Sequence, residues 1–157
     1  MTERQWALLL VGLQMLLFTL LVGALLLLPP GQAGSGRWLG GGMTLLGLVV
    51  ILIAVGTYFR VNGSLVNVSP EPDAGAQLVV VGIYRFIRHP IYTGVMLSAV
   101  GAALAHGHVL PLLLSLLVCS FFTYKSVFEE RWLARVYANY DQYRQRAGRF
   151  LPKLMRQ

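Results

Sequence analysis

Two adjacent carboxylates, Glu129 and Glu130, stand directly after a long apolar run near the C-terminal end of the chain. Lys125 precedes Glu129 by four residues, so the two side chains share one face if this stretch is helical. Charged groups beside an apolar segment are costly unless they have a partner or a purpose. This favours a ligand-binding role; the alternative is a helix-surface salt bridge worth only about 0.3–0.5 kcal/mol.

A second set of polar groups lies in the segment GIYRFIRHPIYTG, which begins at Gly82. Pro90 suits the first turn of a helix, where a missing N–H costs nothing. The free N–H groups of that turn, with Arg88 and His89 ahead of them, can receive an anion or a heterocycle acceptor. The alternative is a basic anchor before an apolar helix, with Gly94 serving helix packing alone. Small residues recur at four-residue spacing: Gly94, Ser98 and Ala102.

The C-terminal stretch combines aromatic and basic side chains. Spacings of three and four residues predict one aromatic stripe on an amphipathic helix at an interface. The stripe comprises Trp132, Tyr137, Tyr140 and Tyr143. We interpret these side chains as anchors and packing residues. His106 and His108 have no Cys or acidic residue nearby in the sequence, so no metal site is predicted.

The elements that position these groups belong to a chain of unusual composition. Of 157 residues, 56% are hydrophobic and 12% are charged, with a mean hydropathy of +0.64. This composition excludes a soluble enzyme, a disordered protein and a disulfide scaffold, and it predicts a small polytopic membrane protein. A net charge of +7 in a soluble protein would suggest nucleic acid. Because the basic residues flank apolar runs, we expect contact with the lipid bilayer and no nucleic-acid partner.

The apolar runs predict an all-α fold: a polytopic membrane helix bundle of about four transmembrane helices with a cytoplasmic amphipathic C-terminal helix. The whole chain, 1–157, forms a single integral membrane domain. The expected membrane helices are 6–28, 38–59, 91–105 and 110–128, with a cytoplasmic cofactor loop at 60–90 and a cytoplasmic amphipathic tail at 129–157. The last two apolar runs are short for a full crossing, so they form a hairpin packed on the other spans or depend on polar flanks.

Basic residues predict the orientation of the bundle. They are concentrated in the 60–90 loop and in the tail, whereas the loop at 29–37 holds only Arg37 and the loop at 106–109 holds none. Basic loops stay on the cytoplasmic side. We therefore expect a multi-pass protein of a bacterial inner membrane or an organellar membrane, with both termini and the active site on the cytoplasmic side.

A set of motifs occurs in a fixed order between 57 and 152. The first part is Leu78-Val79, Gly82-x-Tyr84-Arg85 and Arg88-His89-Pro90-x-Tyr92-x-Gly94. After a hydrophobic hairpin, the second part is Glu129-Glu130-x-x-Leu133-x-x-x-Tyr137, then Tyr140, Tyr143 and Arg149-Phe150-Leu151-Pro152. This order resembles that of the isoprenylcysteine carboxyl methyltransferase family and its relatives, the phospholipid N-methyltransferases.

The resemblance implies an integral membrane methyltransferase that uses S-adenosylmethionine and methylates a lipophilic acceptor such as a prenylcysteine-like carboxylate. The residues implied to bind the cofactor are Gln77, Leu78, Val79, Tyr84, His89, Pro90, Ile91, Tyr92, Gly94, Glu129 and Glu130. Lys125 and Arg88 are the expected substrate-binding residues. No catalytic residue is predicted, since a carboxylate acceptor needs no general base, whereas an amine would lose its proton to His89 or a glutamate.

Other functions remain open from the sequence. The acceptor could instead be a phospholipid amine or a small thiol. A sterol-type membrane reductase shares the Arg-His-Pro-x-Tyr-x-Gly pattern, but it would bind NADPH and has Asn where this chain has Ile91. A membrane scaffold without turnover would bind neither cofactor. The sequence leaves the oligomeric state undetermined.

Overall fold

The computed structural model describes residues 3–66 and 77–153, so part of the expected cofactor loop, 67–76, lies outside the described residues. The secondary structure of the described residues is helical apart from one isolated parallel β-bridge between Ile87 and Gly148. The helices are α1 (Glu3–Leu27), α2 (Gly36–Asn62), α3 (Pro90–His106), α4 (Val109–Val136) and α5 (Tyr140–Arg146), with a short 3₁₀ turn, η1 (Gly82–Arg85), before α3.

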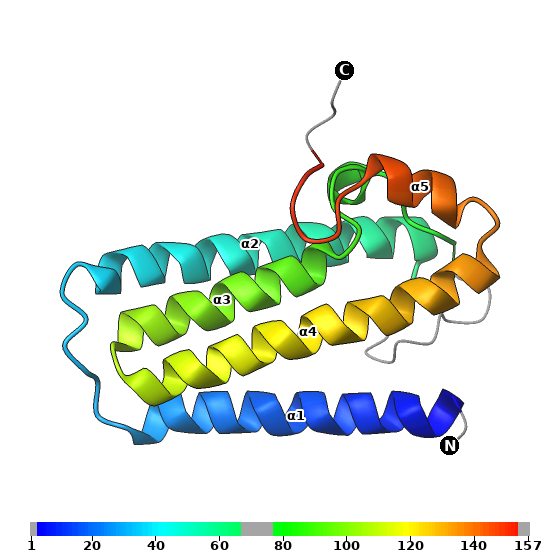
Figure 1. The fold of residues 1–157 in the computed structure, drawn as a ribbon. Coiled ribbons are helices and arrows are strands. Elements are labelled where there is room, and N and C mark those ends of the chain that lie inside the picture. The colour runs from blue at the N-terminus through cyan, green and yellow to red at the C-terminus, as the bar shows by residue number, and fades with distance from the viewer. Residues whose placement is uncertain (1–2, 67–76, 154–157) are drawn as a thin grey trace.

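The four long helices lie side by side and form a membrane helix bundle (Figure 1). Helix α3 packs against α2 on one side and α4 on the other, and α1 packs against α4. Three of them, α1, α2 and α4, are long and apolar enough to cross a membrane, while α3 is a shorter apolar helix of 17 residues. The expected all-α membrane bundle is confirmed.

A tight hairpin joins α3 to α4. Gly107 adopts the left-handed conformation, with φ of 73°, and its N–H donates to Ala103 O at the end of α3. This conformation suits glycine, which lacks a Cβ. His108 then caps α4, because its Nδ1 accepts a hydrogen bond from Leu110 N at 3.2 Å. The hairpin fixes α3 beside the helix that carries the two glutamates.

Glycines bring α2 and α3 into backbone contact. A Cβ added at Gly47 would lie 2.5 Å from Gly94 O and 2.7 Å from Ser98 N. Gly40 of α2 and Gly101 of α3, each seven residues from Gly47 and Gly94 respectively, oppose each other in the same way. In lipid, small residues let helices associate through close packing rather than through the hydrophobic effect. The predicted small-residue seam is therefore present, but it uses Gly101 rather than Ala102 because the helices meet at alternating spacings of three and four.

We expect Gly47→Ala to destabilise the protein by about 1–3 kcal/mol, because the added methyl group meets backbone atoms that have no room to move. Gly42→Ala is the matched control on the same helix, since a Cβ there has nothing within 4 Å. It should be neutral or slightly stabilising. Thermal unfolding in detergent measures both. Equal melting temperatures for the two variants would contradict the close packing described here.

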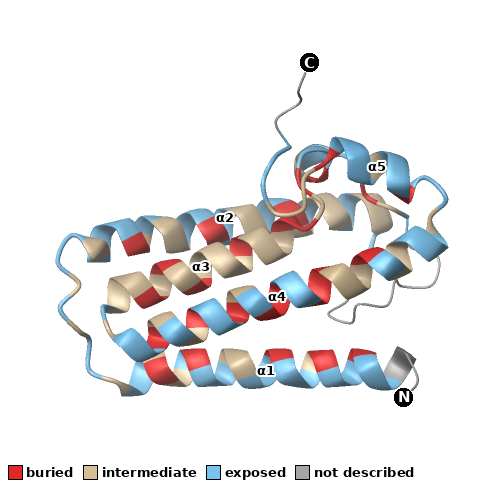
Figure 2. Cartoon of the chain, viewed as in Figure 1, coloured by how far each residue is buried: buried red, intermediate tan, exposed pale blue. Residues whose placement is uncertain are grey.

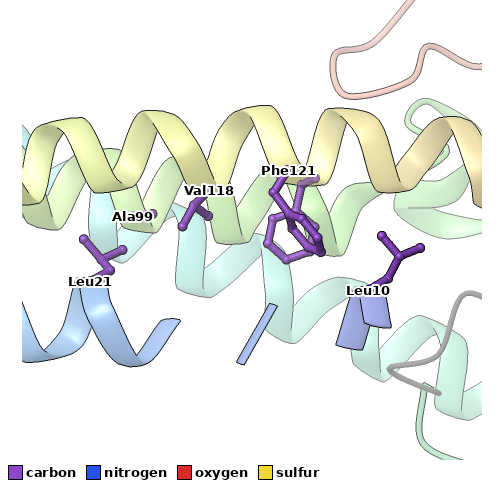
Figure 3. Packing of buried hydrophobic residues seen from close by; sticks show 6 residues of the cluster. Leu10, Leu21, Ala99, Val118 and Phe121 are labelled. Atoms are coloured by element: carbon purple, nitrogen blue, oxygen red, sulfur yellow. The ribbon is translucent and has the colours of Figure 1, made fainter. Parts of the chain in front are cut away.

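A second packing region joins α1 and α4 to α3. Its buried side chains are Leu10, Leu21, Ala99, Val118, Phe121 and Phe122. Those labelled in Figure 3 lie in the space between the helices. The outward faces of α1 and α2 are largely exposed (Figure 2), and they carry leucine, valine and isoleucine. An exposed apolar surface of this extent is expected for helices that face lipid chains.

The predicted boundary of the last membrane helix is wrong. Helix α4 was expected over 110–128, but it continues to Val136 without a break, so the two glutamates lie within it. The segment EERWLARV contains strong helix formers and neither glycine nor proline, which explains the extension. The tail is not one amphipathic helix either, because α5 is the only helix among the described residues that follow Tyr137. Helix α2 likewise runs on to Asn62.

Candidate active site

Three segments meet at the end of the bundle where α4 finishes: the stretch before α3, the C-terminal part of α4 and the chain after α5 (Figure 1). The stretch before α3 pairs with the chain after α5 through backbone hydrogen bonds. Arg88 N donates to Gly148 O at 2.8 Å, His89 N donates to Arg149 O at 3.1 Å, and Gly148 N donates to Phe86 O at 3.0 Å. This pairing holds the Arg-His-Pro segment beside α4.

Glu130 is the centre of a buried ion-pair network. Its Oε1 lies 2.9 Å from Arg88 Nη2 and 3.2 Å from His89 Nε2, and its Oε2 lies 3.0 Å from Arg149 Nη2. Its side chain is only 5% exposed. Arg88 also donates to the carbonyl oxygens of Ala147 and Arg144. Glu130 therefore ties together the three segments that form this end of the protein.

Glu129, one residue earlier, has a different environment. Its Oε2 accepts a hydrogen bond of 2.6 Å from Tyr92 Oη and lies 3.7 Å from His89 Nδ1. The imidazole of His89 stacks on the ring of Tyr92, with centroids 5.2 Å apart and planes 9° apart. Because the Glu129 side chain keeps 24% of its surface exposed, it presents a held carboxylate to a ligand. Such a carboxylate binds an ammonium group or hydroxyls.

Lys125 lies one turn further into the bundle and is 1% exposed. Its Nζ donates a hydrogen bond of 2.6 Å to Gln14 Oε1 of α1, and it sits 5.7 Å from the ring centroid of Tyr92 and 6.0 Å from that of Phe122. Gln14 is not among the site residues predicted from the sequence. The available signal was a lone amide within the uncharged apolar run 6–28, because a polar side chain is costly in lipid and indicates a polar partner.

The segment expected to line a cofactor begins at the end of α2. The side-chain amide of Asn62 holds the backbone of Gln77 through two hydrogen bonds. Asn62 Nδ2 donates to Gln77 O at 3.3 Å, and Gln77 N donates to Asn62 Oδ1 at 2.7 Å. Leu78 is half-buried, and Val79 packs with Ala54 of α2 in a small apolar cluster. These contacts hold residues 77–79 against the C-terminal end of α2, just before η1.

Tyr84, in η1, belongs to the same apolar cluster and is 8% exposed. Tyr143 Oη of α5 donates a hydrogen bond of 2.6 Å to Tyr84 O, which fastens α5 onto this segment. Burial, reinforced by the negative charge of Glu129, raises the pKa of Tyr84 above its ordinary value. Its phenol therefore stays neutral at physiological pH and keeps a proton to donate.

The structure brings some of the predicted site residues together and separates others. Glu129, Tyr92, His89 and Lys125 form one contiguous group at the start of α3 and on α4. The backbone of Gly94 packs against α2, and Arg88 is 8% exposed with its guanidinium bound to Glu130 and to two carbonyls. This geometry gives both a structural position. Two others frame the group at the start of α3: Pro90, which is buried, and Ile91, which packs on the Tyr84 cluster.

The sequence profile of one protein family covers most of this arrangement. The profile described as phospholipid methyltransferase matches residues 36–140, from the start of α2 to the start of α5. The chain belongs to the phospholipid methyltransferase family. Membership in this family and three long apolar helices identify the chain as an integral membrane protein.

The curated proteins that are similar to this chain include isoprenylcysteine methyltransferases, the family that the sequence motifs resemble. A protein-S-isoprenylcysteine O-methyltransferase of Schizosaccharomyces pombe is 36% identical over 77 residues, which cover 48% of this chain and 33% of that protein. Probable protein-S-isoprenylcysteine O-methyltransferases of Oryza sativa subsp. indica and subsp. japonica are each 29% identical over 112 residues, covering 70% of this chain and 58% of each relative. The family resemblance predicted from the motifs is confirmed.

The chain thus matches between 33% and 58% of the length of these relatives. No solved structure matches it. The family match includes Lys125, His89 and both glutamates, so the contiguous group described above lies within the part shared with the phospholipid methyltransferase family.

Proposed function

We propose that the chain is a membrane methyltransferase that uses S-adenosylmethionine to methylate a lipophilic acceptor, such as a prenylcysteine-like carboxylate. The observation that carries the proposal is the partly exposed carboxylate of Glu129, held by Tyr92 Oη at 2.6 Å beside a buried histidine. It lies within the region matched by a methyltransferase family.

The residues at this end of the bundle fit the proposed cofactor. S-adenosylmethionine, when bound, supplies an activated methyl group. Its ammonium and ribose hydroxyls need a carboxylate, which Glu129 offers, whereas Glu130 has both oxygens engaged by cationic partners. The neutral phenol of Tyr84 offers a further hydrogen bond, and the segments 77–79 and 89–92 would enclose the adenosine part. The buried imidazole of His89 and the partly buried ring of Tyr92 that stacks on it limit the access of water to the Glu129 carboxylate.

Lys125 is the proposed partner of the acceptor. Its ammonium is buried one turn into the bundle from Glu129 and contacts Gln14 and two aromatic rings. An acceptor carboxylate would pair with this charge and needs no general base. Holding the acceptor oxygen about 3 Å from the methyl carbon is then the main catalytic task. An acceptor with a long apolar chain would enter laterally from lipid.

The proposed orientation places the site on the cytoplasmic side. The end of the bundle that carries Glu129 also carries Arg60, Arg85 and the basic residues of α5, while the opposite end carries Arg37 (Figure 1). Basic segments remain cytoplasmic during membrane insertion. Both termini and the cofactor would therefore lie in the cytoplasm.

The test is calorimetric binding of S-adenosylhomocysteine to the detergent-purified native protein, with NADPH as the comparison ligand. We expect S-adenosylhomocysteine to bind and NADPH not to bind. Binding of NADPH alone would instead support a sterol-type reductase, and binding of neither ligand by folded protein would support a scaffold.

The acceptor class is tested by transfer of a labelled methyl group from S-adenosylmethionine to three acceptors. They are a farnesylcysteine analogue, a phospholipid amine and a small water-soluble thiol. Preferred labelling of the farnesylcysteine carboxylate is expected because Lys125 offers a buried cation. Preferred labelling of the amine would instead require a base, for which His89 stands beside Glu129. Equal turnover of the soluble thiol would contradict lateral entry from lipid.

A further inference from the structure

A pocket of about 490 Å³ lies beside the C-terminal part of α4, under α5 and the chain that follows it. Its lining residues are Val127, Glu130, Arg131, Ala134, Arg135, Arg144 and Arg149. The volume is within the range of small-ligand sites, about 300–1,000 Å³. The pocket is therefore large enough for a compact polar ligand.

This pocket is separate from the Glu129 group. An α-helix turns by about 100° per residue, so Val127 and Ala134 lie on the side of α4 opposite Lys125. The groups that surround Lys125 and Glu129, namely Gln14 and Tyr92, do not line this pocket. A ligand here would leave the proposed methyl-transfer site accessible.

The lining carries an excess of positive charge. Four arginines from three different segments converge on the pocket: two from α4, one from α5 and one from the chain after α5. The one carboxylate among the lining residues, Glu130, is already paired with Arg88 and Arg149. The side chains of Arg131 and Arg144 are exposed. Guanidinium groups can bind phosphate oxygens in a bidentate manner, so this lining suits a phosphate group.

We propose that this arginine pocket binds a phosphate ester, on the face of α4 opposite the methyl-transfer site. Two sources offer this chemistry, the headgroup of an anionic phospholipid and a soluble phosphate metabolite. The proposal rests on the lining charges alone and does not depend on methyl transfer. A phosphate seated here would bridge α4 and α5, and so would stabilise the tail that carries Tyr143.

The experiment measures binding to the detergent-purified full chain by calorimetry at low ionic strength. The probes are sn-glycerol 3-phosphate, dihexanoyl-phosphatidylglycerol and, as the probe without phosphate, dihexanoylglycerol. We expect Arg131→Gln and Arg144→Gln each to weaken binding of a phosphate-bearing probe about tenfold, because each removes a charge-assisted contact. Arg60→Gln is the matched control, since Arg60 is an exposed arginine outside the pocket lining.

The outcomes separate the two sources. Tighter binding of dihexanoyl-phosphatidylglycerol than of sn-glycerol 3-phosphate supports a lipid headgroup, and equal binding supports a soluble phosphate ester. The proposal is overturned if neither phosphate probe binds, if dihexanoylglycerol binds equally well, or if Arg60→Gln weakens binding as much as Arg131→Gln and Arg144→Gln do. The melting temperatures of the three variants are measured without ligand. If they equal that of the native protein, a loss of binding is due to the pocket and not to a loss of folding.

Discussion

Replacing Glu130 with alanine is expected to destabilise the protein by about 3–5 kcal/mol, the cost of removing one partner from a buried ion pair. Arg88 would remain 8% exposed without the carboxylate that lies 2.9 Å away in the native protein. Arg149 and His89 would lose contacts to the same side chain. Because these partners come from three segments, the backbone pairing at 86–89 and 148–149 should loosen as well.

Thermal unfolding in detergent, followed by circular dichroism, measures this effect. The matched control is Glu129→Ala, which removes a carboxylate of the same type from the adjacent position but only one short hydrogen bond, to Tyr92. We expect it to cost about 1 kcal/mol. Limited proteolysis after α4 should also become faster in Glu130→Ala. Equal stability of the two variants would show that Glu130 is not the structural centre of this end of the bundle.

Much of this arrangement could be predicted from the sequence because the relevant physics is local. Uninterrupted apolar runs predicted the four helices of the bundle, and Pro90 marked the start of α3 correctly. The α3–α4 hairpin also follows from its glycine and its short length. The motif around His89 and the Glu129-Glu130 pair were selected from charge beside apolar residues, and the structure places them within 4 Å of each other.

Contacts between distant segments could not be predicted in this way. Lys125 bonds Gln14 across 111 residues, and the sequence contains no signal that pairs these two side chains rather than any other two polar groups. The pairing of Arg88 with Gly148 depends on how the tail returns after α5. Helix α4 was also ended too early, since apolar composition defines a membrane span but does not determine where a helix stops.

The different environments of Glu129 and Glu130 could not be predicted from the sequence either. They lead to a specific prediction about cofactor binding. Adjacent residues of one type look equivalent in a motif, yet a rotation of about 100° along the helix separates them. It directs Glu130 into the arginine network and Glu129 towards Tyr92 and a partly exposed surface. The proposed cofactor should therefore depend directly on Glu129, and on Glu130 only through folding.

We expect Glu129→Gln to weaken S-adenosylhomocysteine binding by about tenfold to 100-fold, because a carboxylate contact to an ammonium or to hydroxyls contributes about 1.5–3 kcal/mol. Glutamine keeps the size of the side chain, and its carbonyl oxygen can still accept the hydrogen bond from Tyr92. The melting temperature should therefore stay close to that of the native protein. Calorimetry on both proteins measures the affinities.

Gln14→Leu is the control that separates the cofactor from the acceptor. It removes the amide that holds Lys125 Nζ at 2.6 Å and leaves the Glu129–Tyr92 contact unchanged. It should affect methylation of the acceptor while S-adenosylhomocysteine affinity stays within about twofold, since the hydrogen bond that it removes lies outside the proposed cofactor site. If instead Glu129→Gln binds as tightly as the native protein, the cofactor does not contact this carboxylate. The methyl-transfer site would then have to be sought elsewhere in the bundle, even though the family assignment would stand.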